Sequence, residues 1–267
     1  MKIAFTKIEG AGNDFILIDN REGAIPYLKK GIKRELCLRK KGVGANGILL
    51  LEKDNDFPFM MRYFNADGSE AEMCGNGARC VALYAFSKGA VSRKFSFRSK
   101  SGIHSVEILK GNRVKVELPA CDFKKNMGLK IEGKQCDCFF LTVGVPHVVI
   151  FMKNIEKIDV LRTGRKIRNL KIFGTHGTNV NFVRYEGKNR LTIRTYERGV
   201  EGETLSCGTG VAAASAIAYR KKMVSLPLYV KTASGETITV SFNQTKGKLI
   251  PYLLARAHIV FSGVVEV

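Results

Sequence analysis

Two short stretches of this sequence share one design and lie 133 residues apart. The first, CGNG, begins at Cys74, and the second, CGTG, begins at Cys207. Each stretch leads into a run with apolar residues at helical spacing. The start of a helix presents unpaired backbone N–H groups and the positive end of the helix dipole, which attract anions and favour the thiolate form of a cysteine. The pattern therefore predicts two helices that each begin at a reactive thiol.

Further landmarks recur in the same order and at nearly the same spacing. They are Ser101-Gly102 with Ser234-Gly235, Asn46 with Asn179, and Gly12 with Gly144. We infer two tandem, pseudo-equivalent domains, with a boundary near Pro119. Many short strand-like runs surround one helical run in each half, and from Val211 to Ala218 that run is almost entirely small and apolar. We therefore expect an α+β fold in which a curved sheet wraps around one buried helix per domain.

Composition is that of an ordinary globular protein, with 45% hydrophobic and 25% charged residues in 267. No apolar stretch approaches the roughly 20 residues that span a bilayer, and the N-terminus does not resemble a signal peptide. We expect a soluble cytoplasmic protein without a membrane partner. The net charge of +20 could indicate nucleic acid, an acidic small substrate or a lysine-rich genome. The densest basic run, residues 29–41, fits an amphipathic helix with a solvated basic face, and we expect no nucleic-acid site.

Two other patterns are not expected to carry function. Residues 42–47 match G-x-G-x-x-G, but a helical pattern precedes them and a strand-like run follows, which is the reverse of the dinucleotide-binding order. The cysteine count of seven is odd, so a disulfide framework is not expected. Cys136 and Cys138 have no second ligand pair, so no metal site is expected. The other three cysteines, Cys37, Cys80 and Cys121, are expected in the core.

The paired cysteines suit one kind of chemistry. Proton abstraction next to a carboxylate needs a base, an acid on the opposite face and stabilisation of the charge that develops. Two thiols at helix starts can supply these functions if one is thiolate and the other thiol. His147 and Glu197 are candidates to orient or deprotonate the cysteines. On spacing alone, however, a lone histidine after a proline is more often structural.

Five motifs carry a resemblance to a known family over the full length of the chain. They are GAGNDF at 10–15, FNADGSEAEMCGNGARC at 64–80, GVPH at 144–147, GTNVNFV at 177–183 and YERGVEGETLSCGTG at 196–210. In these motifs the sequence resembles the diaminopimelate epimerases, which are cofactor-independent. The resemblance implies interconversion of LL- and meso-2,6-diaminopimelate in bacterial lysine synthesis, with no pyridoxal phosphate or other cofactor and no metal. It also implies a homodimer.

The same resemblance assigns roles to individual residues. It implies that Cys74 donates and Cys207 accepts a proton in the usual direction, and that His147 and Glu197 tune these thiols. It places substrate-binding groups at Asn13, Asn65, Gly75, Asn76, Asn179, Glu197, Arg198, Gly208 and Thr209. It implies two pseudo-symmetric domains, each a barrel-like, mainly antiparallel sheet around a central helix. We expect them to span 1–118 with about 256–267, and 119–255.

The sequence departs from the commonest family pattern in two places. Val145 stands where an Asn often contacts the distal end of the substrate, and Asn46-Gly47 replaces an Asp-Gly or Gln-containing variant. Both departures affect specificity. Diaminopimelate remains the expected substrate because Asn65, Asn179 and Arg198 are present for its distal amino-acid group. The alternatives are a racemase of another amino acid such as histidine, and a non-enzymatic carboxylate- or nucleic-acid-binding protein.

Overall fold

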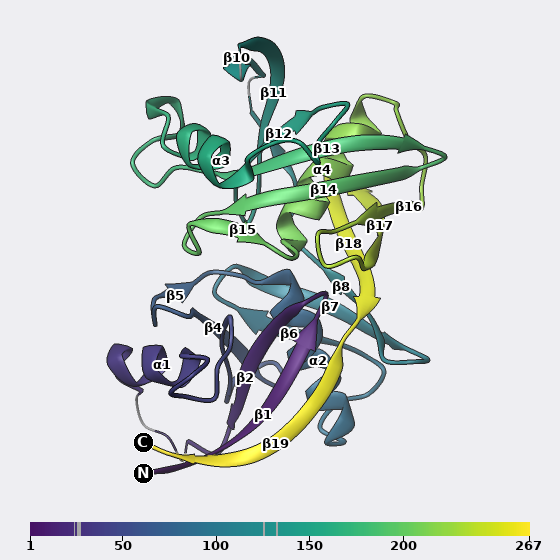
Figure 1. Ribbon diagram of the computed structural model, residues 1–267. Helices are drawn as coiled ribbons and strands as arrows, with labels where there is room; N and C mark the ends of the chain where they lie inside the picture. Colours follow the sequence, from purple (N-terminus) through teal and green to yellow (C-terminus); the bar gives the residue numbers. More distant parts are fainter. Residues whose placement is uncertain (24, 26–27, 125, 132) are drawn as a thin grey trace. The chain divides into compact units, whose positions relative to one another are not determined.

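The protein divides into two compact units. A computed structural model describes residues 1–23, 25, 28–124, 126–131 and 133–267. One unit comprises Met1–Glu117 together with Ala255–Val267, and the other comprises Leu118–Leu254. We call them unit 1 and unit 2. Each unit consists of a curved, mixed sheet with helices on both of its faces (Figure 1).

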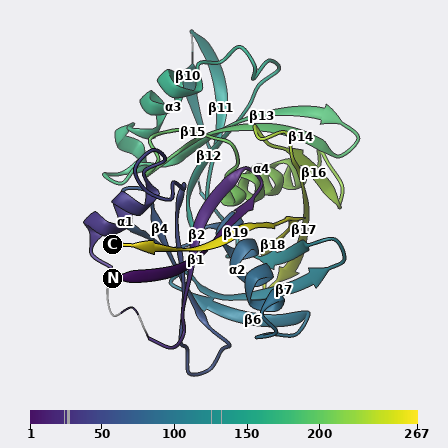
Figure 2. The same ribbon diagram turned by 60° about the horizontal axis from the view of Figure 1, so that its bottom comes forward.

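In its described residues, unit 1 contains two helices and a curved sheet. Its helices are α1 (Lys30–Cys37) and α2 (Gly75–Ser87). Its strands are β1 (Lys2–Gly10), β2 (Asn13–Asn20), β3 (Gly47–Glu52), β4 (Met60–Asn65), β5 (Glu70–Ala71), β6 (Lys94–Ser99), β7 (Gly102–Leu109), β8 (Arg113–Glu117) and β19 (His258–Glu266). The C-terminal strand β19 pairs with β1, and β1 also pairs with β2 (Figure 2).

Unit 2 repeats this plan. Its helices are α3 (Val160–Arg168), the short 3-10 helix η1 (Lys171–Phe173) and α4 (Gly208–Arg220). Its strands are β9 (Asp122–Phe123), β10 (Met127–Ile131), β11 (Lys134–Val143), β12 (Val145–Phe151), β13 (Asn179–Gly187), β14 (Arg190–Glu197), β15 (Gly202–Thr204), β16 (Leu228–Lys231), β17 (Thr237–Thr245) and β18 (Lys248–Arg256), which ends just past the unit boundary.

The strand pairings confirm the repeat inferred from the sequence. In unit 1 the pairings run β19-β1-β2-β3-β4-β6-β7-β8. In unit 2 they run β10-β11-β12-β13-β14-β16-β17-β18. Most pairs are antiparallel, but β2–β3 and β4–β6 are parallel, and so are β12–β13 and β14–β16 at the corresponding places. Each parallel pair is joined by a segment that contains a helix, as a parallel connection requires.

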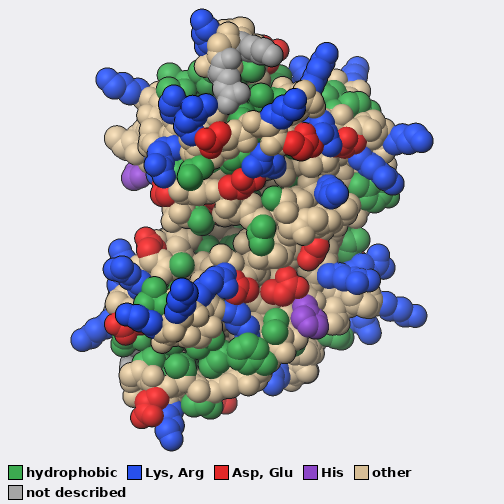
Figure 3. Space-filling model, in the orientation of Figure 1, with side chains coloured by type: hydrophobic (Ala, Val, Ile, Leu, Met, Phe, Trp, Pro, Cys, Tyr) green, Lys and Arg blue, Asp and Glu red, His purple; other side chains and the backbone are tan. Residues whose placement is uncertain are grey.

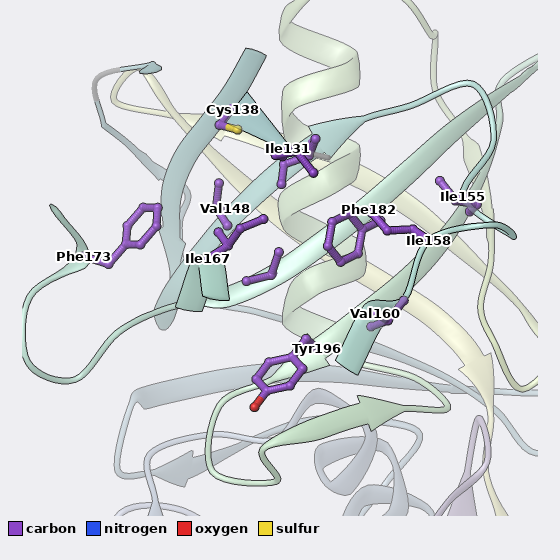
Figure 4. Close-up of a cluster of buried hydrophobic side chains, with 12 residues drawn as sticks. Ile131, Cys138, Val148, Ile155, Ile158, Val160, Ile167, Phe173, Phe182 and Tyr196 are labelled. Atoms are coloured by element: carbon purple, nitrogen blue, oxygen red, sulfur yellow. The ribbon is translucent and has the colours of Figure 1, made fainter. Parts of the chain in front are cut away.

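The central strands are buried on both faces. Successive side chains of a strand point to opposite faces of the sheet. In β3, Ile48 and Leu50 join the cluster that packs against α1, whereas Leu49 contacts α2 on the other face. In β13, Phe182 lies in the cluster that includes Val160 and Ile167 of α3, as Figure 4 shows. The alternate residues of β13 therefore face α4.

The two central helices, α2 and α4, are buried nearly all round. Residues 75–85 of α2 and 208–218 of α4 are all buried, which confirms the expectation of one buried helix per domain. The last glycine of each motif permits the close approach of helix and sheet. A Cβ added to Gly77 would lie 2.7 Å from Leu49 Cδ2, and one added to Gly210 would lie 2.3 Å from Asn181 Oδ1. Packing of the helix against the sheet therefore requires glycine at both positions.

Other expectations from the sequence are confirmed. Part of the basic run, Lys30–Cys37, forms α1, whose buried side includes Leu36 and Cys37, whereas residues 38–41 lie beyond the helix. Cys80 and Cys121 lie in the core. The glycine-rich stretch 42–47 connects the end of α1 to the start of β3, so it does not lead from a strand into a helix. In the described part of the chain, no helix has the length and apolarity needed to cross a bilayer.

The excess positive charge is dispersed. Lys and Arg side chains are scattered over the visible surface of both units, with Asp and Glu among them (Figure 3). Many of the arginines are neutralised locally; Arg62, for example, contacts both Glu52 and Glu70. On this face, the positive charge is thus spread over both units.

Replacing Gly210 with Ala should destabilise the protein by about 1–3 kcal/mol, because overpacking in a filled core forces its neighbours to move. The neighbour is Asn181, which is fixed by hydrogen bonds to His147, Val148 and Thr195. Urea unfolding under reducing conditions measures the effect. Gly31→Ala in α1 is the control, since an added Cβ there meets nothing within 4 Å. Equal stability of the two variants would contradict the packing argument.

Candidate active site

Both cysteines cap the buried helices, as the sequence predicts. Cys74 is the N-cap of α2, with an extended backbone, and its Sγ accepts a hydrogen bond from the Gly77 N–H at 3.4 Å. Cys207 is the N-cap of α4, also extended, and its Sγ lies 3.5 Å from Thr209 Oγ1. Cys207 is buried and Cys74 is half-buried. Each sulfur therefore lies at the positive end of a helix, where a thiolate is stabilised.

In unit 1 the expected substrate-binding residues lie at one end of adjacent strands. Asn65 pairs with Gly47, which in turn pairs with Phe15, two residues after Asn13. Asn13 itself pairs with Gly10, and a Cβ on Gly10 would lie 3.5 Å from the backbone oxygen of Asn76 in the first turn of α2. The fold thus brings Asn13, Asn65 and the start of α2 to the same end of the sheet.

Ion pairs and hydrogen bonds of Asp14 stabilise the loop that carries Asn13. Asp14 accepts two hydrogen bonds from Arg39, at 3.0 and 2.8 Å, and pairs with Lys7 at 2.8 Å. Burial opposes ionisation of Asp14, but the hydrogen bonds and charges of Arg39 and Lys7 outweigh it and lower the pKa of this carboxyl. Asn46 belongs to the same network: its Oδ1 accepts from the Asp14 N–H, and its own N–H donates to Asp14. Asn46, one of the departures from the family pattern, is therefore hydrogen-bonded to the loop that carries Asn13.

In unit 2, Asn179 joins two segments of the site. Its Nδ2 donates to the Pro146 carbonyl at 3.1 Å, and its Oδ1 accepts from the Arg198 N–H at 2.8 Å. The β12–β13 pairing places Asn179 beside His147, the residue after Pro146. Part of the hydrogen-bonding capacity of Asn179 is therefore used to hold the Arg198 backbone and the GVPH segment together. Arg198 itself is half-buried.

Glu197 lies beside Cys207. Burial raises the pKa of the Glu197 carboxyl to about 7, and hydrogen bonds from the Thr204 hydroxyl and the Cys207 side chain act in the opposite direction. The Thr204 bond is 2.8 Å long. A carboxyl that titrates near neutral pH and is hydrogen-bonded to a thiol can exchange a proton with that thiol under ordinary conditions. Thr204, which fixes the carboxyl, was not identified from the sequence.

His147 is fully buried in the same unit. Burial lowers its pKa to about 3, and the positive charge of Arg198 adds to the effect. Its Nδ1 lies 3.2 Å from Nδ2 of Asn181, which is also fully buried. Sequence reasoning missed Asn181; the available signal was a polar residue between two apolar residues, Val180 and Phe182, of a strand.

A third residue that the sequence analysis missed is Arg79 in α2, whose exposed fraction is 0%. It donates from Nη1 to the Gly75 carbonyl at 3.2 Å and from Nη2 to Asn76 Oδ1 at 2.7 Å. A guanidinium is thereby held at the first turn of the helix that Cys74 caps, and the Asn76 carboxamide is fixed. The equivalent position of α4 is Ala212, so the two half-sites share a backbone plan and differ in charge.

A probable proline racemase from Agrobacterium radiobacter K84 has a similar structure, with a TM-score of 0.78 over 99% of this chain and 92% of that protein, at 14% sequence identity. This likeness shows the fold. The family model for diaminopimelate epimerase matches residues 5–121 and 139–259.

Relatives with similar sequences match nearly the whole chain. The diaminopimelate epimerase of Aquifex aeolicus (strain VF5) is 39% identical over 97% of this chain and 96% of its own length. That of Chlorobaculum tepidum is 38% identical over 97% and 99%. The chain is thus an isomerase of the epimerase class. It belongs to the diaminopimelate epimerase family, which confirms the resemblance found in the motifs.

The Glu197 carboxyl predicts how stability depends on pH. Its folded-state pKa of about 7 exceeds the ordinary value of 4.5, so the folded state binds the proton more tightly than the unfolded state between these values. The free energy of unfolding of the native protein, relative to Glu197→Gln, should therefore fall by roughly 1–3 kcal/mol as pH rises through this window and stay constant above it.

Urea unfolding at a series of pH values measures this difference. The exposed Glu72→Gln serves as the matched control for exchanging a carboxylate for an amide. A difference between the native protein and Glu197→Gln that does not change with pH, or that rises with pH, would contradict a raised pKa at Glu197.

Proposed function

We propose that this protein interconverts LL- and meso-2,6-diaminopimelate, with Cys74 and Cys207 as the two proton-transfer groups, and that it acts in lysine biosynthesis. The observation that carries the proposal is the presence of a cysteine at the N-cap of the buried central helix in both units of a diaminopimelate epimerase family member. The repeated placement suits a reaction in which one thiol group serves each face of the substrate carbon.

The proposed reaction has two proton transfers. The thiolate of one cysteine removes the proton from Cα, and the electron pair left behind is delocalised into the adjacent carboxylate. The thiol of the other cysteine then delivers its proton to the opposite face, which inverts the configuration. In the reverse direction the cysteines exchange roles, so each must be able to work as acid and as base.

The helix starts supply the charge stabilisation. Backbone N–H groups in the first turns of α2 and α4 can donate to the reacting carboxylate as negative charge develops on it. Asn76, held by Arg79, and Thr209, next to Cys207, add polar side chains to these two turns. Glu197 can accept the Cys207 proton because its pKa is raised to about 7. The thiolate of Cys207 can form in this way.

The distal amino-acid group of diaminopimelate does not react and needs polar partners. Arg198 is the proposed partner of the distal carboxylate, because its planar guanidinium can donate two parallel hydrogen bonds. Its backbone is fixed by Asn179. Asn65, at the end of β4, is the proposed additional contact. With Val145 in place of an amide, recognition depends on these remaining groups.

We also propose a homodimer. Strand β19 pairs along one edge with β1, and its residues Val260, Phe261 and Val264 are 50%, 49% and 65% exposed. Exposed apolar side chains on a long strand favour association with a second surface. A second copy of the same strand offers a surface of the same character and length.

Replacement of either Cys74 or Cys207 with Ala should slow epimerisation by about 10²–10⁴-fold, the usual effect of losing an acid or base. The loss should occur with both substrate isomers, because each thiol takes part in both directions. Chiral chromatography of diaminopimelate measures the rates. The buried Cys121→Ala is the matched control and should keep near-normal turnover. Near-normal turnover of either active-site variant would reject the paired mechanism.

Replacement of Arg198 with Lys should lower kcat/KM for diaminopimelate about tenfold or more, since a hydrogen bond to a charged group contributes roughly 1.5–3 kcal/mol. Steady-state kinetics on the two isomers measures it, and the exposed Arg190→Lys is the control. An unchanged kcat/KM would mean that the distal group is bound elsewhere or that another amino acid is the substrate.

A further inference from the structure

Asn181 occupies an unusual place for a carboxamide. It lies in the middle of β13, between β12 and β14, and its exposed fraction is 0%. Its side chain is on the face of the sheet that packs against α4, where its Oδ1 would collide with any side chain at position 210. A buried carboxamide must satisfy its polar atoms within the protein, so its hydrogen bonds fix its orientation.

The identity of the two terminal atoms follows from their partners. Nδ2 lies 3.0 Å from the carbonyl oxygen of Val148, which can only accept a hydrogen bond. Exchanging nitrogen and oxygen would set two acceptors against each other. On the other side, Oδ1 accepts from the Thr195 hydroxyl at 3.1 Å. Nδ2 is therefore the atom that faces Val148, and both its hydrogens are donors.

The second hydrogen of Asn181 Nδ2 determines the tautomer of His147. Nδ2 lies 3.2 Å from His147 Nδ1, so Nδ1 must accept. The proton of the imidazole is then on Nε2. Burial and the charge of Arg198 also oppose a second proton, since the pKa of His147 is lowered to about 3. The ring is neutral, and neither nitrogen has a lone pair available to remove a proton.

We propose that Asn181 is a positioning residue that holds His147 as a neutral hydrogen-bond donor whose Nε2–H serves an anion of the reaction, a carboxylate or a thiolate. Among the residues that the structure describes, none accepts a hydrogen bond from the buried Nε2 atom. A buried donor without an acceptor is unfavourable, and an anion is the acceptor that compensates best. The role for an anion rests on the proposed function.

This inference changes the role that the sequence suggested for His147. A residue that deprotonates a cysteine needs a free imidazole nitrogen, whereas Asn181 occupies Nδ1 and the proton occupies Nε2. As a donor, His147 would instead lower the energy of negative charge beside it. Glu197, which accepts hydrogen bonds from the Thr204 hydroxyl and the Cys207 side chain, would then be the base of unit 2.

Nitrogen-15 NMR of the histidine rings tests the tautomer directly and needs no substrate. The chain has four histidines, and the signal lost in His147→Gln assigns His147. At pH 7 we expect Nδ1 of His147 to show the shift of an unprotonated nitrogen and Nε2 that of a protonated one. A proton on Nδ1, or a doubly protonated ring, would overturn the proposal.

Two variants test the role of Asn181 itself. Thr195→Val removes the bond to Oδ1 but leaves the Val148 carbonyl to orient the amide, so the tautomer should stay as in the native protein. Asn181→Leu has no donor for Nδ1, so a mixture of tautomers or a charged ring should appear. A folded Asn181→Leu protein with the native ring signals would show that Asn181 does not set the state of His147.

Kinetic measurements distinguish whether His147 acts as a hydrogen-bond donor or as a general base. Gln can place an N–H near the position of Nε2, whereas Leu cannot, so His147→Gln should retain at least tenfold more kcat than His147→Leu. Equal loss in the two variants would contradict the donor role. If the native protein shows the expected tautomer but does not epimerise diaminopimelate, the proposed function fails while the assignment of His147 as a donor remains.

Discussion

The structure of each unit depends on enclosing one helix within a curved sheet. Eleven consecutive residues of α4, and the same number in α2, are buried, so the start of each helix is surrounded by protein. A buried helix start must satisfy its N–H groups, and here a cysteine sulfur, neighbouring polar side chains and the proposed substrate carboxylate do so. The small residues that let the helix approach the sheet, above all Gly77 and Gly210, follow from the same constraint.

The starts of α2 and α4 have similar backbones but are surrounded by different charged and polar side chains. Unit 1 holds the buried guanidinium of Arg79 at the first turn of α2, together with Asn76. Unit 2 has Ala212 at the corresponding position and instead places Glu197 and His147 among its strands. Because the backbones match and the polar residues do not, the thiols experience different surroundings. A pair in which one member is thiolate and the other thiol requires such a difference.

Much of this arrangement could be predicted from the sequence. Matching landmarks 133 residues apart gave the repeat, and the apolar spacing after Cys74 and Cys207 gave the central helices, because both signals are local or periodic. The parallel pairs within each sheet could not be derived, since strand pairing depends on long-range contacts. Asn181, Thr204 and Arg79 escaped notice because their roles arise from partners on other strands or from complete burial.

The transfer of deuterium from solvent tests most directly whether two different cysteines remove and supply the proton. In deuterated water, one isomer of diaminopimelate is supplied and both isomers are analysed by mass spectrometry early in the reaction. If one cysteine removes the proton and the other supplies a solvent-derived one, the product isomer carries deuterium at Cα while the remaining substrate stays unlabelled. Product that retains the original proton, or substrate that becomes labelled as quickly as product, would show a single base and contradict the account.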